Sequence, residues 1–289
     1  MLCPGGLAGD RSARERRLAN LRTVSNRKPL PVPHALKPAL QQVWPPADRR
    51  PDDISPERMA LAALRHEIDQ LDDEILALFE RRLAIAARVG RAKDAPAGPH
   101  LKLRPDREQA VLRRISARAR PENRETVNSL WREVVGHGLA RQGPIRVQVW
   151  APLEPARAYD AARRRFGAAA EMRVADDPEA ALRWAAEGQG VAVLAVNAGQ
   201  PWWIGLRRQW TSLSVFEGFG GAAPTALALG KIDPAALPAG PRVLVGAGGD
   251  AGDGAGRRVG LATHHGWTLS LADAPLPVGG PEGCVGAIA

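Results

Sequence analysis

The sequence predicts an all-α domain followed by a small α/β domain. Apolar residues recur at alternating intervals of three and four over residues 61–89, which is typical of a long helix packed along one side. Two shorter segments with helical periodicity follow, over about residues 105–120 and 122–142. After Pro144 the pattern changes to short apolar runs that alternate with helical stretches, as in an α/β domain.

We divide the 289 residues into three parts on this basis. Residues 1–54 combine charge with eight prolines and have no sustained period, so we expect them to be disordered. Residues 55–143 form the predicted helical domain, and residues 144–289 form the predicted α/β domain. Met59 lies beside the start of the helical domain. Residues 1–54 are therefore either a functional N-terminal segment or the result of a start codon assigned too far upstream, and the sequence is compatible with both.

Start and stop signals define three helices. Ser55 is a plausible N-cap before Pro56, and the first helical pattern continues to about Ala95. The second helix should begin at Pro105 and end before Pro121, and the third should run from about residue 122 to residue 142. A first helix of about 40 residues is longer than two short helices can cover, so we expect the long helices of two chains to pair in a dimer.

Arg82 interrupts the apolar stripe of the first helix. Its guanidinium does not lose its proton, and desolvating it costs several kcal/mol unless anions or hydrogen bonds meet it. Two more polar residues, Glu108 and Gln142, lie on the apolar sides of the second and third helices. The sequence therefore predicts either a buried ion pair of Arg82 with Glu108 or a polar pocket for an anionic ligand.

The helical segments carry a specific set of motifs. The stretch LAALRHEIDQLDDEILALFERRLAIAARVGRAKDA, followed by RPDREQAVLRRI and VNSLWREVVGHGLARQG, resembles the AroQ-type chorismate mutase family over about residues 60–143. The shared motifs are LRxEID(x)LD, an arginine in ERR, VGxxK, RE at the start of the second helix and a terminal glutamine. The resemblance implies a three-helix domain in a dimeric bundle, with six site residues: Arg65, Arg82, Lys93, Arg107, Glu108 and Gln142.

This resemblance also implies a reaction and a role for each side chain. In the family, arginines and the lysine hold the two carboxylates of chorismate, and the arginine matching Arg65 comes from the partner subunit. The lysine and the glutamine, here Lys93 and Gln142, hydrogen-bond the ether oxygen of the breaking bond. The glutamate, here Glu108, meets the ring hydroxyl. The implied function is the rearrangement of chorismate to prephenate in aromatic amino acid biosynthesis, without a cofactor, a metal or a covalent intermediate.

Two positions depart from the family pattern. Arg104 stands where an acid is common, and Gly138 stands where a serine lines the site. Since neither position contacts the ether oxygen, we expect altered substrate affinity and not loss of activity.

Two segments of the second half are similar to the opening lobe of prephenate dehydratase: VWAPLEPARAYDAARRRFG and ADDPEAALRWAAEGQGVAVLAVNAG. The later run PTALALGKIDPAALPAGPRVLVGA resembles that family's stretch around its Thr-Arg-Phe motif. The Thr-Arg-Phe motif of that family reads Thr225-Ala226-Leu227 here, so dehydration of prephenate is expected to be lost. The run from Arg257 to the C-terminus has two interpretations, a reduced ACT-like regulatory unit or a scaffold that stabilises a dimer. We prefer the scaffold.

Composition and charge indicate which partners and which cellular location to expect. The net charge is +9, but no basic stretch is interleaved with aromatic residues, so we expect no nucleic-acid partner. No apolar run is long enough to span a membrane, so we expect no membrane segment. The two cysteines, Cys3 and Cys284, are too far apart in sequence for a CxxC metal or redox motif. We therefore expect a cytoplasmic location. Three other functions remain open: a bifunctional chorismate mutase-prephenate dehydratase, an isochorismate-pyruvate lyase and a non-catalytic helical dimerisation module.

Overall fold

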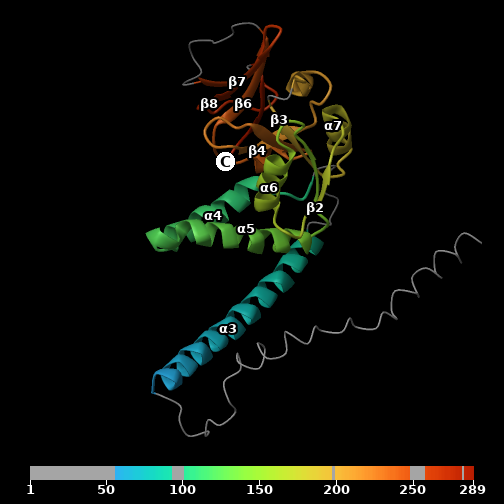
Figure 1. Ribbon diagram of the computed structural model, residues 1–289. Helices are drawn as coiled ribbons and strands as arrows, with labels where there is room; N and C mark the ends of the chain where they lie inside the picture. The colour runs from blue at the N-terminus through green and yellow to red at the C-terminus, as the bar shows by residue number, and fades with distance from the viewer. Residues whose placement is uncertain (1–55, 93–100, 197–198, 248–257, 282) are drawn as a thin grey trace, which may run out of the picture. The chain divides into compact units, whose positions relative to one another are not determined.

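The computed structural model describes residues 56–92, 101–196, 199–247, 258–281 and 283–289. Helices occupy the described chain from residue 56 to residue 140, and a nine-stranded α/β domain follows from residue 146 (Figure 1). The predicted order of fold classes is therefore confirmed. Contacts divide the chain into two compact units, residues 1–67 and 68–289, so α3 contributes to both units and every later element belongs to the second.

Three helices make up the helical part: α3 (Pro56–Ala92), α4 (Pro105–Arg118) and α5 (Arg124–Ala140). Pro105 stands in the first turn of α4, where its fixed φ suits a helix and its missing N–H has no helical acceptor to lose. The third helix starts two residues later than predicted because a 3-10 turn, η2 (Pro121–Asn123), precedes it. Ser55 and residues 93–95, the predicted ends of the first helix, lie outside the described residues.

The apolar stripe of α3 is exposed in this single chain. Its large side chains have exposed fractions between 41% at Val89 and 64% at Leu78. In α3 only Gly90 is buried among the described residues. The predicted apolar stripe is therefore present on α3, but the described residues of the same chain leave it exposed.

The helices α4 and α5 pack against each other, and α5 also contacts α6 (Pro155–Phe166). On α4, Glu108 is buried and Val111, Leu112 and Ile115 are half-buried, which is the predicted face. The helical period of residues 122–142 predicts that Leu130 of α5 faces inward, but its side chain is 56% exposed. The contacts of α5 with the end of α6 include Glu133 and Gly136, which lie further along the helix.

The first half of the sheet is a parallel α/β arrangement. The strand β1 (Arg146–Trp150) pairs in parallel with β2 (Glu171–Val174) and with β3 (Val191–Ala195). The helix α6 connects β1 to β2, and α7 (Pro178–Ala186) connects β2 to β3. The sequence analysis missed β2, because this short edge strand is largely exposed and has no apolar run.

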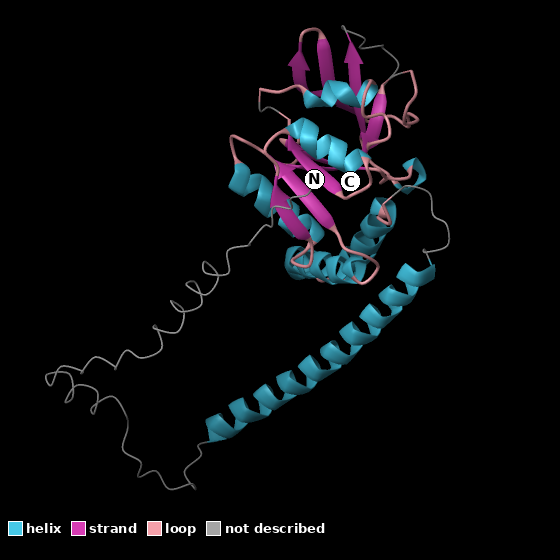
Figure 2. Ribbon diagram, turned by 90° about the vertical axis from the view of Figure 1, so that its right-hand side faces the viewer, coloured by secondary structure: helices cyan, strands magenta, loops and turns pink. Residues whose placement is uncertain are grey.

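The second half of the sheet is mostly antiparallel. The full order is β2-β1-β3-β5-β4-β9-β6-β8-β7. Figure 2 shows the strands in magenta and the helices in cyan. The strand β9 pairs in parallel with β4 and antiparallel with β6, so it joins the two halves into one sheet. The strands β6 and β7 run in the same direction with β8 between them. The bounds of these strands are Ser214–Phe219 for β4, Ala226–Gly230 for β5, Arg242–Ala247 for β6, Arg258–His264 for β7, Trp267–Ala272 for β8 and Cys284–Ala287 for β9.

Two core clusters cover the two faces of the sheet. Alternate residues of β3 divide between them, with Val193 in the cluster that contains α6 and Leu194 in the cluster that contains α7. The α7 side also holds the 3-10 helix η3 (Trp202–Arg207), whose Trp203 is 1% exposed. The helix α6 is thus held against one face of the sheet, and this placement brings its C-terminal turn to α5.

Candidate functional site

Arg82 lies half-buried on α3 and points its guanidinium at α5. Its Nη1 donates a hydrogen bond to the carbonyl oxygen of Val134 at 2.7 Å, and burial lowers the pKa of Arg82 from its ordinary value. Gly138 provides the space for this contact, because a Cβ at that position would lie 2.8 Å from Arg82 Nη1. In the described part of the chain, Arg82 meets a backbone carbonyl and no carboxylate.

Gln142 lies at the end of the same segment. Its Nε2 donates to the carbonyl oxygen of Gly138 at 3.3 Å. The C-terminal turn of α3 approaches it closely, since a Cβ on Gly90 would lie 2.8 Å from Gln142 Cα. Arg82 and Gln142 thus both contact Gly138, and the structure brings together these two predicted site residues from α3 and from the residues that follow α5.

Glu108 belongs to a different cluster, which the sequence analysis did not anticipate. Its Oε2 accepts a hydrogen bond from Arg165 Nη1 at 2.7 Å, and both side chains are buried. Arg165 also donates through Nε to Glu217 Oε2. Arg132 on α5 interacts electrostatically with all three of these residues. The alternative in which Glu108 pairs with Arg82 is therefore wrong, and the partner of Glu108 is an arginine of the α/β domain.

The electrostatics of this cluster keep Arg165 charged. Burial alone would lower the pKa of Arg165, but the two carboxylates outweigh burial and raise it. The pKa of Arg132 is lowered, first by burial and then by repulsion from Arg165. A signal for the cluster was present in the sequence, because Glu217 is a lone acid inside the apolar run LSVFEGF.

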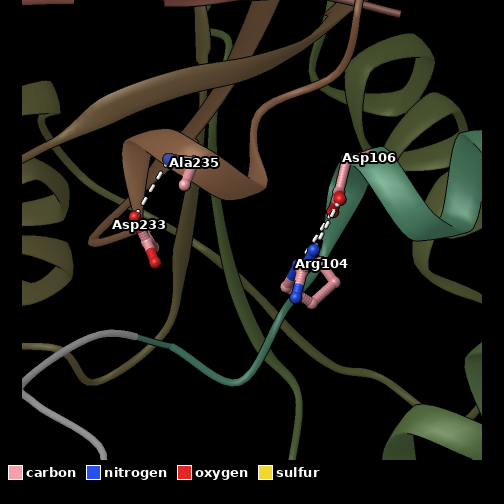
Figure 3. A network of polar contacts seen from close by, with 4 residues as sticks. All are labelled: Arg104, Asp106, Asp233 and Ala235. Atoms are coloured by element: carbon pink, nitrogen blue, oxygen red, sulfur yellow. Dashed lines mark hydrogen bonds and ion pairs between the residues drawn. The ribbon is translucent and has the colours of Figure 1, made fainter.

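Two further predicted site residues, Arg65 and Arg107, belong to neither cluster. Arg65 and Arg107 are exposed in the single chain, and Lys93 lies outside the described residues. Arg104, the second departure from the family pattern, forms an ion pair with Asp106, with its Nη2 2.7 Å from Asp106 Oδ2 (Figure 3). This hydrogen bond holds the pKa of Asp106 below its ordinary value. Figure 3 also shows Asp233 capping the short helix η4 (Pro234–Ala236) through the amide of Ala235.

A cavity of about 270 Å³ adjoins Gln142 where α5 passes into β1. Its lining is mostly apolar and does not include Arg82 or Glu108. A second cavity, of about 360 Å³, lies beyond the carboxyl ends of β1 and β3 and includes Thr225 and the buried Ala226. In the position of the dehydratase arginine, Ala226 brings no charge to this cavity. Neither of these two cavities is lined by Arg65, Arg82 or Arg107.

The described residues contain neither a cluster of metal-binding side chains nor a helix that could span a membrane. No three His, Cys, Asp or Glu side chains within them come close enough together to hold a metal ion. None of the helices in the described ranges combines the length and apolar character that crossing a membrane requires.

Comparison with known proteins identifies the helical segment. Residues 64–143 match the family of chorismate mutase type II, which confirms the resemblance drawn from the sequence. Among curated relatives, a bifunctional chorismate mutase/prephenate dehydratase of Stutzerimonas stutzeri is 37% identical over 111 residues. Proteins with the same name from Neisseria gonorrhoeae and Pseudomonas aeruginosa are 37% and 35% identical over 107 and 111 residues.

These matches cover limited parts of both proteins. The match with the Stutzerimonas stutzeri protein spans 37% of this chain and 30% of that relative's length. No solved structure matches the chain.

Proposed function

We propose that this chain is a chorismate mutase, which converts chorismate to prephenate in phenylalanine and tyrosine biosynthesis. The observation that carries the proposal is the position of Arg82, which is half-buried against α5 beside Gly138 and Gln142, within the segment that matches the mutase family. A guanidinium at this position can hold an anionic substrate, and the neighbouring amide can donate to a developing oxygen charge.

The proposed mechanism uses position and charge alone. The rearrangement is one pericyclic step in which a C–O bond breaks as a C–C bond forms, so no proton, electron or leaving group has to be transferred. Arg82, Lys93 and Arg107 would hold the two carboxylates of chorismate in its compact conformer. Lys93 and Gln142 would donate to the ether oxygen as it gains charge, and Glu108 would accept a hydrogen bond from the ring hydroxyl.

The proposed active form is a homodimer in the cytoplasm. In its support, the stripe of α3 repeats every three and four residues, which is the spacing of two paired helices, and its large side chains are exposed in one chain. Arg65, at the N-terminal end of the stripe, would reach the site of the partner subunit, as the family resemblance implies. The cytoplasmic setting is supported by the scarcity of cysteine.

We further propose three parts for the chain: a Pro/Arg-rich segment over residues 1–54, the mutase domain over residues 55–143 and a scaffolding α/β domain over residues 144–289. A bifunctional mutase-dehydratase is the second candidate. The names of the relatives and the cavity that includes Thr225 favour it, whereas the uncharged Ala226 argues against it.

One experiment separates these functions. The purified full-length protein is incubated with chorismate, the loss of chorismate absorbance is followed, and the products are identified. Prephenate alone supports the mutase. Phenylpyruvate formed without acid treatment supports the bifunctional enzyme, and pyruvate released from isochorismate supports the lyase. A folded dimer without turnover of either substrate would contradict the proposal and favour a dimerisation module.

A further inference from the structure

The cavity of about 270 Å³ beside Gln142 is built by segments that are far apart in the sequence. The residues between α5 and β1 contribute to its lining, as do Gly190 and the first residue of β3, Val191. Residues 101–103, which precede α4, complete it. All of these residues belong to the second compact unit, so the cavity is a feature of one unit and not of a junction between two.

Backbone contacts hold the walls of this cavity. The amide of Leu101 donates to the carbonyl oxygen of Lys231 at 2.8 Å, which ties residues 101–103 to the end of β5. Gly190 passes close to β1, since a Cβ there would lie 2.4 Å from the carbonyl oxygen of Arg146. At Gly143 the position of a Cβ is open space among the described residues. The lining is therefore preformed, and no side chain at residue 143 fills it.

Most of the lining is apolar. Ile145 and Val191 are buried in the core cluster that contains α6, and Leu103 is buried beside them. A dry apolar cavity of about 150 Å³ is large enough to bind benzene. A cavity of about 270 Å³ with this lining therefore has room for one ring and a short side chain.

The ionisable side chains of the lining have one sign. Among the described lining residues they are Lys102 and Arg146, which are both exposed, and no carboxylate accompanies them. Arg146 donates through Nε to Glu171 Oε2 at 3.3 Å, and a guanidinium has further donors on its Nη atoms. Because the apolar residues are buried and the cations are exposed, the charge lies on the solvent side of the cavity. This arrangement is complementary to one carboxylate on an apolar body.

We infer that this cavity is a binding site for a small carboxylate that carries an apolar ring. The ring occupies the space beside Leu103, Ile145 and Val191, and the carboxylate lies at the solvent side with Lys102 and Arg146. The inference goes beyond the proposed function, because the cavity does not include Arg82 or Glu108 and binding there requires no turnover of chorismate.

Titration of the full-length protein with hydrocinnamate, followed by ligand-detected NMR, tests this inference. The probe combines a benzene ring with a carboxylate, whereas hydrocinnamyl alcohol keeps the ring without the charge and acetate keeps the charge without the ring. For a ligand of this size we expect a Kd on the order of 1 mM. The alcohol should bind about 10-fold more weakly, since it loses the attraction of two exposed cations, and acetate should show no measurable binding.

Four variants locate the bound probe. Leu139→Trp fills the cavity from α5 and should weaken binding by about 10-fold or more. Arg146→Met removes a cation of the lining and should weaken binding of hydrocinnamate about 3-fold to 5-fold, without affecting the alcohol. The matched control is Arg157→Met, which removes an exposed arginine from the second cavity. Arg157→Met and Arg82→Ala should both leave the Kd unchanged.

Absence of hydrocinnamate binding to the unaltered chain overturns the inference, and so does equal affinity for the acid and the alcohol. A Kd that rises in Arg157→Met or Arg82→Ala but not in Arg146→Met also overturns it, because the probe then occupies the second cavity or the proposed mutase site. Circular dichroism shows which variants are folded. If Leu139→Trp does not fold, Arg146→Met and the comparison of acid with alcohol decide. Loss of the proposed function leaves this test intact, because binding is measured without turnover.

Discussion

Replacing Arg165 by methionine should destabilise the folded second unit, apart from any effect on catalysis. The substitution leaves Glu108 and Glu217 buried in the same cluster without the cation that both of them bind. Removing one partner from a buried charge cluster typically costs about 3–5 kcal/mol. For a unit of this size each kcal/mol lowers the melting temperature by about 2–4 °C, so we expect a decrease of about 6–20 °C at neutral pH.

Thermal melting by circular dichroism at neutral pH provides the test, with Arg164→Met as the control. Arg164 is the neighbouring residue of α6, and its side chain is 73% exposed in a surface pair with Asp160. Exposed pairs of this kind contribute about 0–1 kcal/mol, so the control should melt within a few degrees of the parent. Equal melting temperatures for Arg164→Met and Arg165→Met would refute the reasoning.

The remaining predictions concern α3 and the start of α4. Ile75→Glu places a charge in the middle of the exposed stripe and should convert the proposed dimer to a monomer, as measured by light scattering after gel filtration. Arg82→Ala should lower kcat about 10²-fold or more with little change in melting temperature. Arg104→Ala should cost less than about 1 kcal/mol at pH 7. Because Arg104 lowers the pKa of Asp106 below its ordinary 3.8, that stabilisation is present above this pH and fades as the pH falls below it, as melting in acid would show.

Matched variants on α3 make two of these results decisive. Ala77 lies about 200° around the helix from Ile75, so Ala77→Glu should leave the dimer intact. Arg88 is an exposed cation of the same helix, and Arg88→Ala should keep the kcat of the parent. A dimer that survives Ile75→Glu, or a loss of kcat as large in Arg88→Ala as in Arg82→Ala, would contradict the roles assigned to the stripe and to Arg82.

Local signals in the sequence predicted the elements well where those signals were strong. Pro105 correctly predicted the start of α4, and the short apolar runs expected after Pro144 include GVAVLAV, which forms the interior strand β3. The edge strand β2 was missed because only one face of an edge strand needs to be apolar, and four residues give too little pattern. Leu130 was assigned to the core from its period alone, but a helical period shows which residues share a face and not whether another element covers that face.

The candidate site could also be predicted only in part, because a helical period identifies the residues on one face but not their partners. The period of α3 identified Arg82 as a cation on an apolar face, and the structure has it half-buried against α5. The partner of Glu108 could not be found in this way, because Arg165 is 57 residues away along the chain. Of the three arginines at the end of α6, only Arg165 continues the series of Ala158 and Ala162, so the sequence contained its inward direction but not its target.

The link between Glu108 and Arg165 also constrains how the two parts of the chain can change. A mutation of Glu217 affects a strand of the α/β domain, yet through Arg165 it changes the surroundings of a carboxylate in α4. Replacing Glu217 alone leaves Glu108 as the carboxylate that compensates the two buried cations, Arg165 and Arg132, whereas replacing Arg165 leaves two carboxylates with only Arg132 near them. A substitution of any one member therefore changes the charge balance around the others, so that changes in α4, α5, α6 and β4 are coupled through this cluster.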